Sequence, residues 1–251
     1  MGDIDDLLVA GLKALPHKPT DDAKQSEKKG YSEDMSEVVA AAFAQALRNR
    51  NLQETVPAGD SPAPRGVKVP HRKGSERRMS GGLGAKNVDV TWATEESGLL
   101  LSISVKTINF ADQNTGNYQK NLTNRRGDML FESTTLHRRF PYAVLAGFVF
   151  LDRGAADDQT EKRKSTFLNT HTRLRMFTGR DDPAGRPEQY ERLYIVLVEA
   201  NPAAPWYEVY RVGDSQTKVS LEEVFHELLE IVAERNPDFY EIVDGKLAKA
   251  T

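Results

Sequence analysis

The fold is decided by two short stretches of alternating sequence, NVDVTW at residues 87–92 and LSISVK at residues 101–106. In both stretches polar and apolar side chains alternate, which is typical of a β-strand with one buried face. The connecting residues 94–98, TEESG, are polar and end in glycine. Such a connection predicts an antiparallel hairpin whose two strands share one apolar face and one polar face.

The polar face of this hairpin carries a carboxylate and a lysine. A loop centred near residues 96 and 97 places Asp89 opposite Ser104 and brings Lys106 to the same face. Cβ atoms of a directly opposed pair lie about 4.5–5.5 Å apart. A carboxylate at a strand end suits Mg²⁺, and a nearby lysine can orient a metal-bound water or stabilise charge on a phosphate. The other interpretation is a solvated hairpin face with ordinary polar residues.

This arrangement resembles the catalytic core of the PD-(D/E)xK nuclease superfamily, to which many type II restriction endonucleases belong. The family pattern is an acidic residue on one strand, here Asp89, and an acid-x-Lys triplet on the next, here Ser104-x-Lys106. Val88 stands where proline is common, and Ser104 replaces the second carboxylate, which removes a metal ligand. Some restriction enzymes of this superfamily carry a Ser-x-Lys version and take the missing carboxylate from a neighbouring helix. The resemblance covers about residues 31–152.

Two glutamates are candidates for the missing carboxylate. Residues 32–49 show apolar side chains at helical spacing, and Glu37 flanks that apolar stripe. The resemblance implies a glutamate on the helix before the catalytic hairpin, so Glu37 is the first choice, although it also fits a solvent-facing boundary position. The second choice is Glu132, on a helix expected over residues 123–138, and Asp128 one turn earlier is weaker. The stripe consists of Met35, Val38, Val39, Ala42, Phe43, Ala46 and Leu47.

Contacts to DNA are expected from two polar segments. Residues 65–86 are rich in lysine, arginine, proline and glycine, which predicts a basic loop that neutralises phosphates. Residues 109–121 are rich in amides that suit base edges or phosphate oxygens. An ordinary solvated linker and plain turn chemistry remain the alternatives. The candidate DNA-binding residues are Arg72, Lys73, Arg77, Arg78, Asn117, Gln119, Lys120, Arg125 and Arg126.

The remaining elements are expected to be structural. They are a buried central strand at 142–151, a charged helix at 157–178, strands at 192–200 and 206–212, and a helix that begins after Ser220. Glu223 completes a capping box with Ser220. No strand is evident ahead of Asp89, and the five histidines lack metal-ligand spacing. The expected fold is α/β, a restriction-endonuclease-like α/β/α sandwich with a mixed central sheet.

Composition narrows the class of protein. The chain has 251 residues, no cysteine and a net charge of −3. Disulfides and thiol chemistry are therefore excluded, and any contact with nucleic acid must be local. No apolar run approaches the roughly 18 residues that span a bilayer, so we expect a cytoplasmic protein with no membrane partner. Residues 1–30 are expected to form a helix and a flexible segment, and 31–251 a single domain with its core at 31–152 and a C-terminal extension. Residues 16–30 and 53–66 are interpreted as linkers or disordered connections.

The expected function is hydrolysis of DNA phosphodiester bonds by a Mg²⁺-dependent endonuclease, with Mn²⁺ as a substitute. Asp89, Glu37 and Glu132 are the expected metal ligands, and Ser104 and Lys106 complete the expected catalytic set. The expected partner is double-stranded DNA, with a homodimer as an option, in restriction or antiphage defence. The alternatives are a repair or junction-resolving nuclease and a catalytically inactive nuclease-like module that binds nucleic acid.

Overall fold

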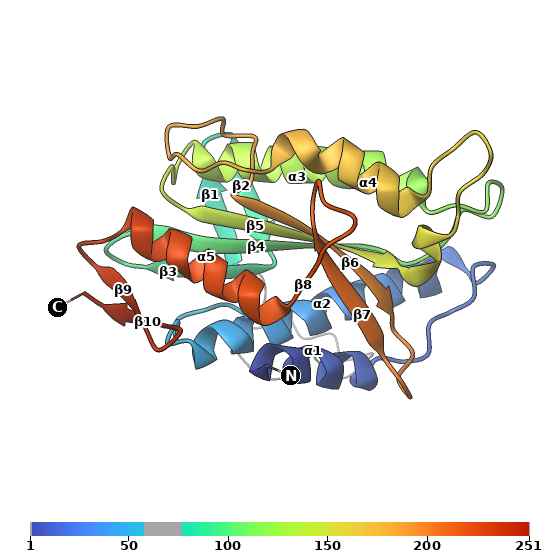
Figure 1. Cartoon of the computed structure of the whole chain (residues 1–251), viewed down its shortest axis with the longest axis horizontal. Helices are drawn as coiled ribbons and strands as arrows, with labels where there is room; N and C mark the ends of the chain where they lie inside the picture. Colours follow the sequence, from blue (N-terminus) through green and yellow to red (C-terminus); the bar gives the residue numbers. More distant parts are fainter. Residues whose placement is uncertain (1, 58–76, 251) are drawn as a thin grey trace.

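A six-stranded mixed sheet with the order β3-β4-β5-β6-β7-β8 runs through the computed structural model, which describes residues 2–57 and 77–250 (Figure 1). Strands β4, β5 and β6 are parallel, and the other neighbouring pairs are antiparallel. The strands are β3 (Val90–Thr94), β4 (Gly98–Ile108), β5 (Val144–Asp152), β6 (Arg192–Glu199), β7 (Trp206–Arg211) and β8 (Lys218–Val219). The predicted strands at 142–151, 192–200 and 206–212 are confirmed, the last as the hairpin partner of β6.

Helices cover both faces of the sheet (Figure 1). The first face is covered by α1 (Asp3–Ala14), α2 (Gln25–Asn49) and α5 (Leu221–Arg235), and the second by α3 (Leu122–His137) and α4 (Thr166–Leu174). Along β5, Phe148 and Phe150 join the core under the first face, while Val149 and Leu151 join the core under the second. This burial on both sides explains the continuous apolar run of β5. The expected α/β class with a mixed sheet is confirmed.

The predicted hairpin is present, with a β-bulge between Trp92 and Ala93 and one further change. β3 and β4 pair antiparallel with Val90 opposite Ile103, and continuing this register by one residue puts Asp89 opposite Ser104. Asp89 itself lies at a bend between two strands, so the predicted strand at 87–92 is divided. The polar face of β4 is not solvated: Ser104 is fully buried because α3 covers it.

Two further hairpins lie outside the main sheet. They are β1 (Arg77–Gly81) with β2 (Gly84–Val88), and β9 (Tyr240–Val243) with β10 (Lys246–Lys249). The expectation of a loop up to residue 86 is therefore wrong from residue 77 onward, and residues 58–76 lie outside the described residues. β1 packs on α3, where the Gly82 amide donates to the Thr135 carbonyl at 2.8 Å. A Cβ on Gly81 would lie 2.3 Å from the Thr135 side chain, so this contact needs glycine.

The helix predictions are correct where the apolar period is strong. The α2 stripe is buried as expected, but α2 begins at Gln25, so residues 25–30 are helical and not a linker. α3 lies within one residue of its predicted bounds, and α5 begins with the Ser220–Glu223 capping box.

The charged helix expected at 157–178 is wrong in its first half. α4 starts at Thr166 because Ser165 caps it and Asp158 accepts the Thr166 amide at 2.6 Å. The flanking segments are the 3₁₀ turns η2 (Arg153–Ala156) and η3 (Arg175–Phe177), and a third 3₁₀ turn, η1 (Gln119–Asn121), precedes α3.

Arg50, directly after α2, joins the first helix to the last. Its guanidinium is 2.9 Å from Asp3 of α1 and 2.6 Å from Glu222 of α5, and it lies over the Phe225 ring. Arg50 is only 5% exposed, whereas the side chains of Asp3 and Glu222 are 43% and 52% exposed, so both ion pairs remain open to solvent on their acidic side. Over the described residues, no helix has the length and apolar character needed to cross a bilayer.

Candidate active site

Three charged side chains from different elements meet where β3 begins. Asp89 lies at the bend before β3, Lys106 is on β4 and Glu132 is on α3. The Lys106 Nζ is 3.4 Å from Asp89 Oδ2 and 3.5 Å from Glu132 Oε2. The same Asp89 oxygen accepts the Val105 amide at 2.7 Å, which fixes the carboxylate against β4. The predicted proximity of Asp89 and Lys106 is confirmed, and we refer to Asp89, Lys106 and Glu132 as the Glu132 cluster.

The Glu132 cluster is largely shielded from solvent. The side chains of Asp89, Lys106 and Glu132 are 17%, 13% and 1% exposed. Burial alone lowers the pKa of Lys106, but the carboxylates of Glu132 and Asp89 outweigh it and raise that pKa above its usual value. Burial raises the pKa of Glu132, and the Lys106 ammonium offsets only part of this effect. The pKa values of Lys106 and Glu132 therefore both lie above their usual values.

Two buried polar atoms of this site make no hydrogen bond of regular geometry within the described part of the chain. They are the Ser104 hydroxyl and the Oε1 atom of Glu132. The Ser104 hydroxyl is nevertheless close enough to the Glu132 carboxyl to lower its pKa. Unpaired buried polar atoms cost free energy unless a water, an ion or a ligand group satisfies them. These atoms therefore indicate a site that takes a polar ligand.

A large cleft opens beside Asp89 and Lys106. Its volume is about 1460 Å³, and its walls come from α2, the β1–β2 hairpin, the end of β4, the following loop and α3. The cationic residues that line it are Lys28, Lys29, Arg78, Lys86, Lys106, Lys120 and Arg125, and they outnumber the acidic lining residues Glu33, Glu37, Asp89, Asp112 and Asp128. Amides from the predicted polar loop, such as Asn109 and Gln113, add hydrogen-bonding groups. The cleft can therefore hold an anionic, extended ligand.

Only some of the predicted DNA-binding residues line this cleft. Arg78, Lys120 and Arg125 do, although Lys120 pairs with Asp112 at 2.5 Å. Arg72 and Lys73 lie outside the described residues. The other candidates, Arg77, Asn117, Gln119 and Arg126, are described but are not among the lining residues. Lys86 of the predicted basic segment also lines the cleft. Sequence reasoning missed Lys28 and Lys29, because the lysines of α2 give no local signal that they face a cleft.

The candidate carboxylates differ in position. Glu37 and Asp128 line the cleft as exposed residues of α2 and α3, whereas Glu132 is buried behind Lys106. Among the described residues, no group of three or more histidine, cysteine, aspartate or glutamate side chains is arranged to hold a metal ion. Asp89 and Glu132 form a pair on the same ammonium. Two carboxylates with an unpartnered oxygen fit Mg²⁺, because this ion keeps several water ligands and also binds oxygens of the substrate. They do not fit a zinc site in which all four ligands come from the protein.

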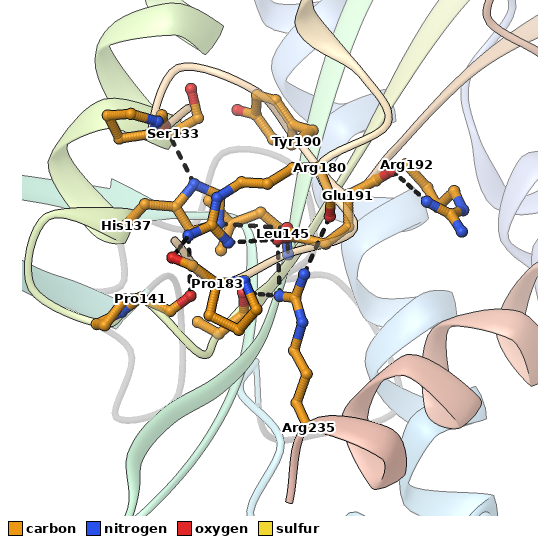
Figure 2. A network of polar contacts seen from close by, with 12 residues as sticks. Ser133, His137, Pro141, Leu145, Arg180, Pro183, Tyr190, Glu191, Arg192 and Arg235 are labelled. Atoms are coloured by element: carbon orange, nitrogen blue, oxygen red, sulfur yellow. Dashed lines mark hydrogen bonds and ion pairs between the residues drawn. The ribbon is translucent and has the colours of Figure 1, made fainter. Parts of the chain in front are cut away.

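A second buried charged cluster lies at the C-terminal end of α3, where His137 follows Glu132 by five residues (Figure 2). Glu191 accepts from Arg180 and Arg235, each at 2.7 Å, from the Leu145 amide at 2.7 Å, and approaches His137 Nε2 at 3.2 Å. Although burial opposes it, these partners, led by His137, lower the pKa of Glu191. We call His137, Arg180, Glu191 and Arg235 the Glu191 cluster. Sequence reasoning missed it, because its members are 11 to 54 residues from Glu191 and share no motif.

We compared the chain with protein-family models, with curated proteins and with solved structures, and none of the three comparisons found a match. The geometry and chemistry of the site therefore carry the functional argument.

Proposed function

We propose that the chain is a Mg²⁺-dependent DNA endonuclease with a restriction-endonuclease-like α/β/α sandwich, similar to the PD-(D/E)xK superfamily. The observation that carries the proposal is the meeting of Asp89, Lys106 and Glu132 at the edge of a cation-lined cleft. The mixed sheet with helices on both faces supports the fold assignment.

Each member of the Glu132 cluster has a role in this proposal. Asp89 and Glu132 would hold the metal ion. Bound Mg²⁺, or Mn²⁺ in its place, supplies Lewis acidity at the phosphate and lowers the pKa of a coordinated water. The protonated Lys106 stabilises negative charge that develops on the phosphate and orients the attacking water. Ser104 leaves room for Glu132 where the usual pattern has its second carboxylate.

The contacts favour Glu132 over Glu37 as the second carboxylate. Glu132 Oε2 is 3.5 Å from the lysine that also contacts Asp89, and its Oε1 has no partner among the described residues. Glu37 is exposed on the wall of the cleft, where it suits contacts with solvent or substrate. This reverses the order that sequence reasoning assigned to the two glutamates.

The cleft supports double-stranded DNA as the substrate. Lysine and arginine side chains on α2, the β1–β2 hairpin and α3 can neutralise phosphates on either side of Asp89. Amide side chains of the loop after β4 can contact base edges. Restriction or antiphage defence in the cytoplasm, by a monomer or a homodimer, is the biological setting that we propose.

The proposal is tested by incubating the full chain with methylated and unmethylated plasmid in Mg²⁺, in Mn²⁺ and in chelator. We expect metal-dependent cleavage that falls about a thousandfold or more in Asp89→Asn and Lys106→Met. Lys18→Met is the matched control, because Lys18 forms a similarly half-buried ion pair with Asp152 outside the cluster. Full cleavage by Asp89→Asn or Lys106→Met, with both variants folded, would refute the site assignment.

One observation favours a second candidate, the inactive nucleic-acid-binding module. The Lys106 ammonium lies between both carboxylates and gives each a partner without a metal. Binding of duplex DNA at low salt with no cleavage in either metal would support this module. Cleavage of branched or damaged DNA, without a fixed sequence, would instead support a repair nuclease.

A further inference from the structure

One face of α3 is fastened to the segment of residues 187–191 at three points. The Tyr190 hydroxyl donates to the Met129 carbonyl at 3.2 Å, and the Ser133 hydroxyl is 3.0 Å from the Glu188 carbonyl. His137 Nδ1 is 3.1 Å from the Pro187 carbonyl. Met129, Ser133 and His137 are spaced four residues apart, so they form a single stripe along the helix. Glu132 directly precedes Ser133, the residue of the middle contact.

The 187–191 segment is itself held firmly at its C-terminal end (Figure 2). Glu191 is completely buried, and its two carboxylate oxygens bind side chains from α3, from α5 and from the loop that contains Arg180. Its contact with the Leu145 amide also ties the segment to β5. The segment therefore offers α3 a rigid reference that is anchored to the sheet.

Tyr190 is the part of this segment that reaches the candidate active site. It is 1% exposed, and burial together with the Glu132 carboxylate raises its pKa well above the usual range, which places the phenol near that carboxylate. Gly147 makes room for Met129 beside it: a Cβ there would lie 2.6 Å from Leu193 and 2.8 Å from Met129, and 3.5 Å from the Tyr190 ring, which is an ordinary contact. Gly147 pairs with Ser104 across β4 and β5. Two small residues thus let α3 and Tyr190 pack closely over the sheet beneath Glu132.

We propose that Tyr190 is a positioning residue that sets the depth of Glu132 against Lys106 by fixing α3 at the Met129 carbonyl, one turn before Glu132. The inference rests on the proposed function, since it gives Glu132 a role in metal binding. Tyr190 is not among the residues that line the cleft. Its hydrogen bond to the Met129 carbonyl acts on Glu132 through the position of α3.

The test compares two buried tyrosines that each lose one hydroxyl. Tyr190→Phe removes the bond to α3, while the control Tyr194→Phe removes a 3.0 Å bond to Glu227 on the other face of the sheet. Both residues are almost fully buried, so similar losses of stability are expected. Mn²⁺ affinity is measured by electron paramagnetic resonance titration of the full chain without DNA. We expect Tyr190→Phe to weaken Mn²⁺ binding about tenfold, as for other residues that support metal ligands, and Tyr194→Phe to change it less than about twofold.

A double variant separates positioning from general loosening. If Tyr190 acts through Glu132, Tyr190→Phe should have no further effect on Mn²⁺ affinity in a Glu132→Gln background. Equal effects of the two tyrosine variants, or full additivity with Glu132→Gln, would overturn the inference.

A crystal structure of Tyr190→Phe separates this inference from the proposed function. If Glu132→Gln leaves Mn²⁺ binding unchanged, or if no Mn²⁺ binds, the proposed function fails. In that case the inference is still tested by the distance between Lys106 Nζ and the Glu132 carboxylate in the Tyr190→Phe structure. A separation clearly beyond the present 3.5 Å supports positioning, and an unchanged one refutes it.

Discussion

The helix α3 takes part in two buried charged clusters. They differ in whether every oxygen of the buried glutamate has a hydrogen-bond donor, which we call a saturated carboxylate. In the Glu191 cluster, both oxygens of Glu191 accept from arginine, histidine or backbone donors. In the Glu132 cluster, one Glu132 oxygen makes no hydrogen bond of regular geometry with the described residues. No member of the Glu191 cluster lines the cleft, whereas Asp89 and Lys106 of the Glu132 cluster do. A saturated carboxylate holds the fold together, whereas an unsaturated one beside a cleft is available to a ligand.

The largest expected effect lies in the Glu191 cluster. Glu191→Gln leaves two buried guanidinium groups, Arg180 and Arg235, without their counter-charge, and such losses cost about 3–5 kcal/mol. Glu132→Gln keeps the shape and leaves Lys106 paired with Asp89, so we expect a change within about 1 kcal/mol. Urea unfolding followed by circular dichroism measures both values. Equal destabilisation by the two variants would remove the distinction between the clusters.

The next effect concerns metal dependence. We expect Glu132→Gln to raise the Mg²⁺ concentration for half-maximal cleavage about tenfold or more, because one of two metal ligands is lost. Glu37→Gln, on the exposed wall of the same cleft, should raise it less than about threefold. Titration of plasmid cleavage with Mg²⁺ checks both. If Glu37→Gln instead had the larger effect, Glu37 would be the second metal-binding carboxylate, as the sequence predicted.

The smallest effect is a pair of opposite pH dependences. The folded-state pKa of Glu191 is lowered, so its contribution to stability is present above the unfolded value of about 4.3 and is lost as the pH falls through the folded pKa. The folded-state pKa of Glu132 is raised, so its ionisation removes stability as the pH rises from about 4.3 through the folded pKa.

Unfolding free energies measured on both sides of about pH 4.3 should therefore diverge. As the pH falls below about 4.3, the advantage of wild type over Glu191→Gln should shrink, and as the pH rises above about 4.3, wild type should lose ground against Glu132→Gln. Parallel curves for the two variants would contradict the assigned pKa directions. A buried tyrosine variant such as Tyr194→Phe controls for general loss of packing.

The local elements of the fold could be predicted because their signals are local. The alternation at 101–106 gives β4, and the period of α2 gives its buried stripe. The register that brings Asp89 to Lys106 also depends on a β-bulge between Trp92 and Ala93, which the sequence did not indicate. The same reasoning missed the β1–β2 hairpin, since a basic, glycine-rich sequence is typical of a loop. Its strands exist because two glycines allow close packing on α3.

Tertiary contacts account for the errors in the site. The choice between Glu37 and Glu132 depends on how α2 and α3 lie on the sheet, which periodicity does not determine. The Glu191 cluster gave no signal at all, because a single glutamate before an apolar strand reads as a surface residue. Its burial follows from partners on α3 and α5 that only the folded chain brings together.

The contact of Arg50 with Glu222 has a consequence for biosynthesis. These residues are 172 positions apart, so at about 5–20 residues per second the ribosome releases α5 roughly 10–30 s after α2. During that interval Phe43 of α2 lacks its later neighbour Phe225, 5.3 Å away in the folded protein. Until α5 emerges, the nascent chain therefore exposes the apolar face of α2. This interval is longer than the time that most of the strands need to leave the ribosome. We expect its yield to depend on chaperones that shield such faces during translation.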